Sequence, residues 1–220
     1  MRPRDAASIL VLDRQTASVK VLVGRRSSRH VFMPDVHVFP GGRRDRRDHA
    51  IVCGPDLQPD VLDRLKSAAG PRAGDARMRA LALAAIRELH EETGLSLGAS
   101  SGDGNEQANG SLPFLPDLSN LRYIARAITP PGHPRRFDTR FFAVFADETG
   151  LDTGMLCNSD ELDDLRWIDV NDTSSVKMPD ITEIILGELN SCLRDDPSLP
   201  FGRPVPFYYT RRGRFVRDLI

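Results

Sequence analysis

The sequence has little of several features that mark specialised classes of protein. Its 220 residues include three cysteines, Cys53, Cys157 and Cys192, whose number and spacing fit neither a disulfide framework nor a zinc site. The formal net charge of −1 gives no general attraction to nucleic acids or anionic membranes. No apolar run approaches the roughly 18 residues of a membrane span, and the first residues lack the apolar core of a secretory signal. We therefore expect a cytoplasmic protein with reduced thiols and with neither a membrane nor a nucleic-acid partner.

The 40% apolar content is enough for a substantial core, and we expect one domain over residues 1–220. Apolar, β-branched segments predict strands over residues 8–12, 18–23, 35–39, 121–128, 135–146 and 165–168. Helical spacing predicts helices over about 75–92 and 179–194. We expect Asp75 to cap the first of these helices and Gly94 to end it in a left-handed conformation. Strands with two main helices indicate an α+β fold, a mixed sheet between helices.

Three glutamates crowd the last turn of the first helix. Glu88 and Glu92 are four residues apart and Glu88 and Glu91 three apart, and each like-charge pair costs a helix roughly 0.2–0.5 kcal/mol. All three also lie at the negative end of the helix dipole. A bound divalent cation would reverse both penalties, and ligands that are all oxygen favour Mg²⁺ or Mn²⁺ over zinc. The alternative is a solvated acidic face on which Arg87 is a surface ion-pair partner.

These residues resemble a known family motif. Residues 87–95, Arg-Glu-Leu-His-Glu-Glu-Thr-Gly-Leu, match the second half of the Nudix box at every fixed position, and residues 39–42, Phe-Pro-Gly-Gly, resemble the loop that opens it. The first half departs from the family pattern. Arg87 follows Gly42 by 45 positions, about 31 more than in the family, and Arg79 stands where the family has its first Glu.

The resemblance implies an α/β/α sandwich that hydrolyses nucleoside diphosphates linked to another group, with Mg²⁺ or Mn²⁺ as cofactor. It implies metal ligation by Glu88, Glu91, Glu92 and a backbone carbonyl of Gly41 or Gly42. Glu88 or the loop residue Glu161 would accept the proton of the attacking water, and Arg87 would steady the carboxylates. In the family the first Glu holds the motif arginine. Here we expect that role to pass to Asp45, Asp48 or Asp75, or the contact to be absent.

The substrate is less well defined. Residues 135–139, Arg-Arg-Phe-Asp-Thr, and the insertion inside the box resemble the coenzyme A diphosphatase branch, which implies coenzyme A or its thioesters. The candidates for binding substrate phosphates are Arg25 and Arg26, in a basic turn over residues 25–30, and Arg136 and Arg140. Either of the last two could instead fix the strand end through Asp138. ADP-ribose, dinucleotides and nucleoside triphosphates remain open, because fold does not fix substrate.

Two further classes of function remain open. A Nudix-fold nucleotide sensor without catalysis would explain the missing first Glu, although such a sensor has little use for three repelling carboxylates. Decapping of nucleic acid is disfavoured because no concentrated basic face with interleaved aromatic residues is present.

Two segments fall outside the regular pattern. The insertion, residues 43–74, has a charged beginning and weak helical spacing that predicts a short helix over about 59–68. Residues 98–116 are rich in Gly, Ser and Asn, and we expect a flexible surface loop. The insertion could form a lid or an oligomer contact, so a homodimer also stays open.

Overall fold

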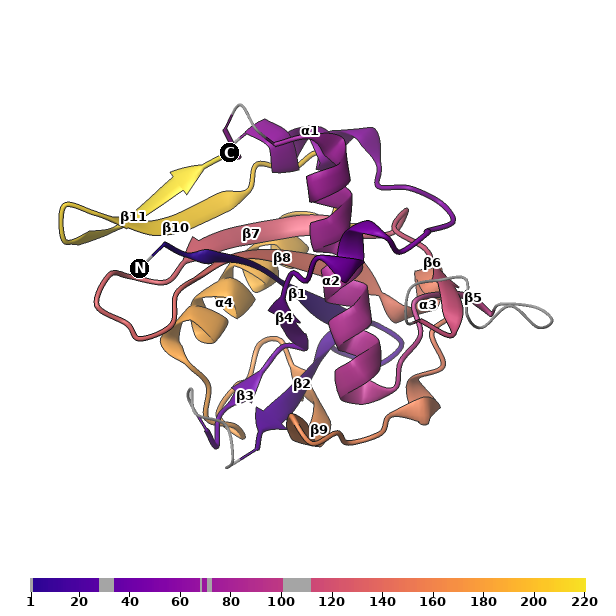
Figure 1. Cartoon of the computed structure of the whole chain (residues 1–220). Helices are drawn as coiled ribbons and strands as arrows, with labels where there is room; N and C mark the ends of the chain where they lie inside the picture. The colour runs from indigo at the N-terminus through magenta and orange to yellow at the C-terminus, as the bar shows by residue number, and fades with distance from the viewer. Residues whose placement is uncertain (1, 28–33, 68, 71–72, 101–111) are drawn as a thin grey trace.

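The computed structural model describes residues 2–27, 34–67, 69–70, 73–100 and 112–220, and its centre is a mixed sheet (Figure 1). Strands β1 and β8 pair in parallel, as do β7 and β10, and the other pairs of this sheet are antiparallel. Strand β4 (Gly41–Arg43) pairs with β1, and β9 (Leu162–Asp169) pairs with β2. The main path of the sheet runs β11 (Arg214–Leu219), β10 (Pro206–Arg211), β7 (Arg122–Ile128), β8 (Phe137–Phe145), β1 (Arg4–Asp13), β2 (Lys20–Arg26), β3 (His37–Val38).

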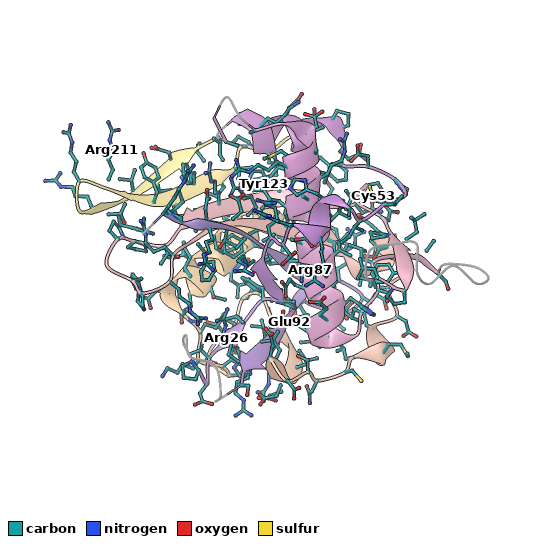
Figure 2. All side chains as sticks on the ribbon, in the orientation of Figure 1. Arg26, Cys53, Arg87, Glu92, Tyr123 and Arg211 are labelled. Atoms are coloured by element: carbon teal, nitrogen blue, oxygen red, sulfur yellow. The ribbon has the colours of Figure 1, made fainter. Side chains whose placement is uncertain are left out.

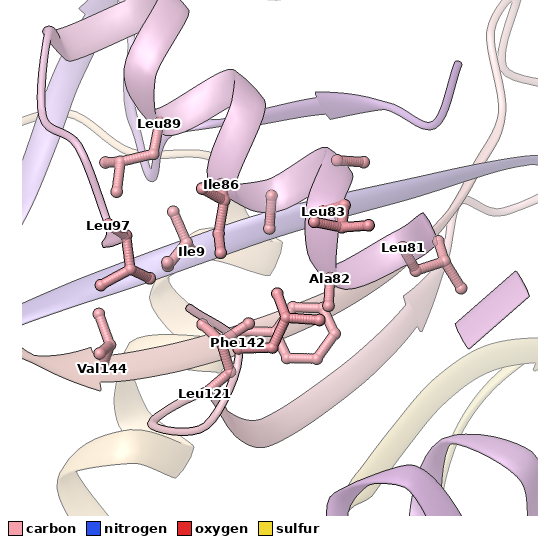
Figure 3. Packing of buried hydrophobic residues seen from close by; sticks show 14 of the residues in the cluster. Ile9, Leu81, Ala82, Leu83, Ile86, Leu89, Leu97, Leu121, Phe142 and Val144 are labelled. Atoms are coloured by element: carbon pink, nitrogen blue, oxygen red, sulfur yellow. The ribbon is translucent and has the colours of Figure 1, made fainter. Parts of the chain in front are cut away.

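Alternation along β1 builds a separate core on each face of the sheet. Ile9 and Val11 pack with the apolar side of α2 (Asp75–Thr93), together with Phe142 and Val144 of β8 (Figure 3). Leu10 and Leu12 point the opposite way and pack with α4 (Asp180–Asp195). The predicted mixed sheet between helices is therefore confirmed.

Helix α2 keeps most of the predicted pattern. Gly94 ends it with a left-handed backbone (φ 78°), as predicted. The prediction that Asp75 is the N-cap was wrong, because Gly74 occupies that position and Asp75 is the first helical residue. The carboxylate of Asp75 instead pairs with Lys66 of the preceding helix at 3.2 Å. That helix, α1 (Pro59–Ser67), confirms the short helix predicted inside the insertion.

The predicted flexible loop over residues 98–116 was wrong at both ends. Gly98–Ser100 (β5) and Phe114–Pro116 (β6) form an antiparallel pair, and Phe114 is buried. The positive φ of Gly98 and its close approach to the backbone of Leu115 suit this pairing, since a Cβ there would lie 2.1 Å from the Leu115 carbonyl oxygen. Residues 101–111 lie outside the described residues, as do residues 28–30 of the basic turn.

The C-terminal hairpin of β10 and β11 was not predicted, and it projects from the body of the molecule (Figure 1). Only its first strand contributes to the core, through Tyr208. A one-turn helix, α3 (Ala146–Thr149), and two 3₁₀ turns, η1 (Arg47–His49) and η2 (Thr153–Met155), complete the described elements. No helix within these residues combines the length and apolar character needed to cross a membrane.

Candidate active site

Arg87 is the centre of a network at the C-terminal half of α2 (Figure 2). One nitrogen of its guanidinium, Nη1, donates to Glu88 Oε1 at 2.8 Å and to Glu91 Oε2 at 2.9 Å. Another, Nη2, donates to the backbone carbonyl of Arg43 at 3.2 Å. These bonds place the arginine between the helix and the strand that begins at the Gly-Gly turn. Arg87 therefore steadies two of the three carboxylates, as predicted for this residue.

The carboxylate of Asp48 supplies the partner that the family motif draws from its first Glu. Asp48 Oδ1 accepts from Arg87 Nε at 2.7 Å, and Asp48 is fully buried within η1. Burial alone would lower the pKa of Arg87, but hydrogen bonding to Asp48 and the charge of Glu88 outweigh it, and the pKa is raised. Of the three substitutes allowed by the sequence, the structure selects Asp48. The family's first Glu is missing from this sequence, and the insertion provides Asp48 in its place.

The Gly41-Gly42 turn lies directly against the glutamates. The backbone N–H of Gly41 donates to Glu92 Oε2 at 2.8 Å. A Cβ on Gly42 would lie 2.3 Å from Glu88 Oε1, so only glycine leaves room for this carboxylate. Strand β4 is held in place through its pairing with β1, where Gly41 lies opposite Ser8. The turn and the end of α2 form one contiguous corner, which we call the acid corner (Gly41, Gly42, Glu88, Glu91 and Glu92).

The acid corner does not match a solvated acidic face. Glu92 is 6% exposed and the Glu88 side chain 13% exposed, whereas the Glu91 side chain is 51% exposed. Burial raises the pKa of Glu92 well above its usual range, and the charge of Glu88 adds to the rise. Burial also raises the pKa of Glu88, in spite of Arg87 beside it. A buried carboxylate that is repelled by a second, largely buried one is costly unless a positive charge joins them.

The charges of Glu161 and Arg26 act on the same corner from other elements. Glu161 precedes β9 and is exposed, and its charge raises the pKa of both Glu88 and Glu92. Arg26 ends β2 and is half-buried. Burial lowers its pKa, while the charges of Glu92 and Glu161 act in the opposite direction. The backbone joins the two segments, because Ser27 N–H donates to the carbonyl of Glu161 at 3.1 Å. The charges of both predicted residues therefore act on the glutamates of the corner.

The structure does not bring the other predicted phosphate ligands to this corner. Arg25 pairs with Asp163 at 2.8 Å, and Arg136 Nε donates to the Thr129 carbonyl at 3.0 Å. Arg140 is 1% exposed and pairs with Asp138 at 3.1 Å, the structural role that the sequence also allowed. Its guanidinium presents almost no surface to a phosphate, so the assignment of Arg140 to substrate binding was wrong. Successive residues of a strand face opposite ways, which separates Arg25 from Arg26.

The donor set suits a hard divalent cation. Carboxylate oxygens and a carbonyl at a glycine turn are the ligands that Mg²⁺ and Mn²⁺ prefer. As the structure stands, Arg87 and the Gly41 amide occupy these carboxylates, and no group of three His, Cys, Asp or Glu side chains within the described ranges has the geometry of a metal site. A cavity of about 200 Å³ opens beside the corner, lined by Arg43, Asp45, Arg47, Arg87, Glu88 and Glu91.

Comparison of the sequence with known proteins identifies a relative. No family model matches the chain. A curated protein of Caenorhabditis elegans, putative nudix hydrolase 7, is 29% identical over 184 residues, which covers 76% of this chain. The chain spans about half the length of this relative (51%).

Comparison with solved structures gives the same fold. The crystal structure of a NUDIX hydrolase from Alicyclobacillus acidocaldarius is 26% identical, with a TM-score of 0.62, covering 87% of this chain and 93% of that one. The NUDIX domain of Shewanella oneidensis NrtR, crystallised with ADP ribose, has a TM-score of 0.51 and covers 88% of this chain and 90% of its own, at 11% identity. At that identity the likeness concerns the fold alone.

Proposed function

We propose, on the premise that this chain belongs to the Nudix family, that it hydrolyses the diphosphate bond of a nucleoside diphosphate linked to another group. The observation that carries the proposal is the acid corner itself. The helix end that bears Glu88, Glu91 and Glu92 meets the Gly41-Gly42 turn, where Glu92 is buried and the Glu88 side chain is only 13% exposed. A divalent cation bound at this corner would offset the repulsion between the carboxylates and could bind a diphosphate.

The corner fits Mg²⁺ or Mn²⁺. Glu88, Glu91 and Glu92 would hold the ion with a carbonyl of Gly41 or Gly42. Glycine at position 42 keeps the carboxylate of Glu88 close to this backbone, since any side chain there would collide with it. When bound, such an ion neutralises the diphosphate oxygens and lowers the pKa of a coordinated water.

The protein's own residues divide the remaining tasks. Arg87, fixed by Asp48, orients Glu88 and Glu91 rather than touching substrate. Glu88 or Glu161 takes the proton from the attacking water. Arg26, on which the charges of Glu92 and Glu161 act, would contact a phosphate of the substrate.

The substrate proposal begins with coenzyme A or its thioesters. Its support is the resemblance of residues 135–139 and the insertion inside the box. The arginines of that segment have structural partners, so any selectivity must come from other residues. ADP-ribose, dinucleotides and nucleoside triphosphates are therefore kept in the same screen.

A catalytically inactive nucleotide sensor is the candidate from another class. Its support is the split box and the missing first Glu, in whose place the sequence has Arg79. The presence of Asp48 as the partner of Arg87 counts against it, because the motif arginine keeps its buried ion pair in spite of the split box.

One assay separates these functions. Coenzyme A, ADP-ribose, dinucleotides and nucleoside triphosphates are incubated with the protein and Mg²⁺, and products are identified by mass, with EDTA as the control. We expect a nucleoside 5′-phosphate and its complementary phosphorylated product from at least one substrate; for coenzyme A the nucleoside product would be adenosine 3′,5′-bisphosphate. The use of ¹⁸O-labelled water then shows which phosphorus was attacked. Tight binding of a nucleotide without turnover of any substrate would favour the sensor and overturn the hydrolase.

A further inference from the structure

A second cavity adjoins the acid corner and has the opposite charge. It has a volume of about 480 Å³ and is lined by Arg4, Asp5, Arg43, Arg44, Asp45 and Arg46. Arg43 and Asp45 also line the cavity at the acid corner, so the two are contiguous. The size falls in the range of small-molecule sites. We call it the arginine cavity.

The two aspartates of the arginine cavity are already committed to other partners. Asp5 pairs with Arg44 at 3.3 Å, with Arg77 at 2.8 Å and with Arg140 at 3.4 Å. Asp45 accepts from the backbone N–H of Arg47 at 2.9 Å and also pairs with its side chain.

The remaining three arginines have positive charges without an internal partner. Within the ranges that the structure describes, the side chains of Arg4, Arg43 and Arg46 form no ion pair and no side-chain hydrogen bond. Each belongs to an exposed residue that lines the cavity. Three unpaired guanidinium groups around one cavity make a site for an anion, and the planar guanidinium suits the oxygens of a phosphate.

The backbone beneath these arginines is fixed. The N–H of Arg4 donates to the Arg136 carbonyl at 2.9 Å, which ties the start of β1 to β8. The N–H of Arg44 donates to the Asp5 carbonyl at 3.0 Å and extends the pairing of β4. The N–H of Asp45 donates to Asp48 Oδ2 at 2.6 Å, which connects this segment to the partner of Arg87. The arginine stems therefore start from anchored positions beside the acid corner.

From this geometry we infer that the arginine cavity binds a phosphoryl group of the substrate other than the diphosphate that is cleaved. The inference rests on the proposed function and narrows it to substrates that carry an additional phosphate. That phosphate has two chemical sources, a phosphomonoester on a ribose or a further phosphate in a linear chain. The insertion that splits the Nudix box supplies Arg43, Arg44 and Arg46, so it acts in substrate selection.

The first test compares substrates that differ by one phosphate. Values of kcat/KM are measured for coenzyme A and 3′-dephospho-coenzyme A, and for ATP and ADP, with wild type, Arg46→Ala and Arg4→Ala. Arg214→Ala is the matched control, since it removes an exposed arginine from the projecting hairpin, on β11. We expect Arg46→Ala and Arg4→Ala to lower kcat/KM for the phosphate-rich substrate by about 10-fold to 100-fold, mainly through KM. The substrate that lacks the phosphate should change by less than about twofold.

The second test does not depend on turnover. Binding of adenosine 3′,5′-bisphosphate and of AMP is measured by calorimetry without metal. Wild type and Arg214→Ala should prefer the bisphosphate, and Arg46→Ala should lose the preference. If the protein prefers the bisphosphate in this way but turns over no substrate, the phosphate site in the arginine cavity is supported and the hydrolase proposal fails. Turnover with equal use of both members of each substrate pair would overturn the arginine cavity and leave the hydrolase intact. Arginine dependence confined to the ATP and ADP pair would assign the phosphate to a linear chain.

Discussion

The substitution Asp48→Asn tests whether the insertion supplies the partner of the motif arginine. It keeps the shape of a fully buried side chain and removes its charge from Arg87, whose side chain is only 10% exposed. Breaking one side of a buried ion pair costs about 3–5 kcal/mol, and we expect the lower end because Glu88 and Glu91 still hold the guanidinium. About 3 kcal/mol corresponds to a fall in Tm of roughly 6–12 °C for a chain of this size.

The same substitution should affect activity, because a displaced Arg87 releases Glu88 and Glu91. Loss of a residue that orients metal-binding groups without touching the metal typically costs about 10-fold to 100-fold in activity or metal affinity. Thermal unfolding and kcat/KM for the best substrate are measured together. The matched control is Asp45→Asn, three residues earlier, whose partner Arg47 has a side chain 78% exposed. The control should stay within about 0.5 kcal/mol of wild type. If both variants melt together and keep full activity, Asp48 does not have this role.

Three other predictions follow from positions elsewhere in the fold. Gly42→Ala should lower kcat about 100-fold, because its Cβ would lie 2.3 Å from Glu88 Oε1 and must displace that carboxylate; an unchanged kcat would show that the close packing of Gly42 against Glu88 is not needed for activity. Gly187→Ala should raise stability by about 0.5–1 kcal/mol in thermal unfolding, since a methyl group added to this exposed glycine of α4 would meet nothing within 4 Å; a lower Tm contradicts this. Burial would raise the pKa of Asp5, but Arg140 and Arg77 outweigh it and lower the pKa below 3.8. Asp5→Asn should therefore cost about 3–5 kcal/mol near pH 7. Urea unfolding should show this cost beginning to shrink only below about pH 3.8, where Asp5 of the unfolded chain takes up a proton, and continuing to shrink as the pH falls through the lower pKa of the folded protein; a cost independent of pH down to 2 would refute it.

The parts of the fold with strong periodicity could be read from the sequence. Helix α2 and six strands of the central sheet (β1, β2, β3, β7, β8 and β9) were predicted because their apolar residues repeat at helical or strand spacing, and Gly94 marked the end of the helix. The hairpin of β10 and β11 was not, since β11 is exposed along most of its length and buries no apolar face. The pair of β5 and β6 was obscured by small, polar residues between two short strands.

The sequence predicted only those parts of the site whose residues are close to one another along the chain. The glutamates of α2 predicted a cation site because their mutual repulsion can be inferred from their spacing within one turn of helix. The partner of Arg87 comes from 39 positions away, and Asp45, Asp48 and Asp75 were equally plausible on sequence alone. Arg140 looked like a phosphate ligand because the strand around it resembles a known pattern, but burial with Asp5 and Asp138 commits its charge inside the protein. Such long-range ion pairs depend on tertiary packing, which short sequence patterns do not contain.

The central claim is that the acid corner carries cleavage of a diphosphate that depends on a divalent cation. The most direct measurement is the rate of product formation, followed by mass with Mg²⁺ at saturation, for wild type, Glu91→Gln and Glu92→Gln. Each variant should fold at least as stably as wild type without metal, because one of the repelling charges at the end of α2 is gone. Each should lose turnover by at least about 100-fold. Full activity in both folded variants would contradict the claim.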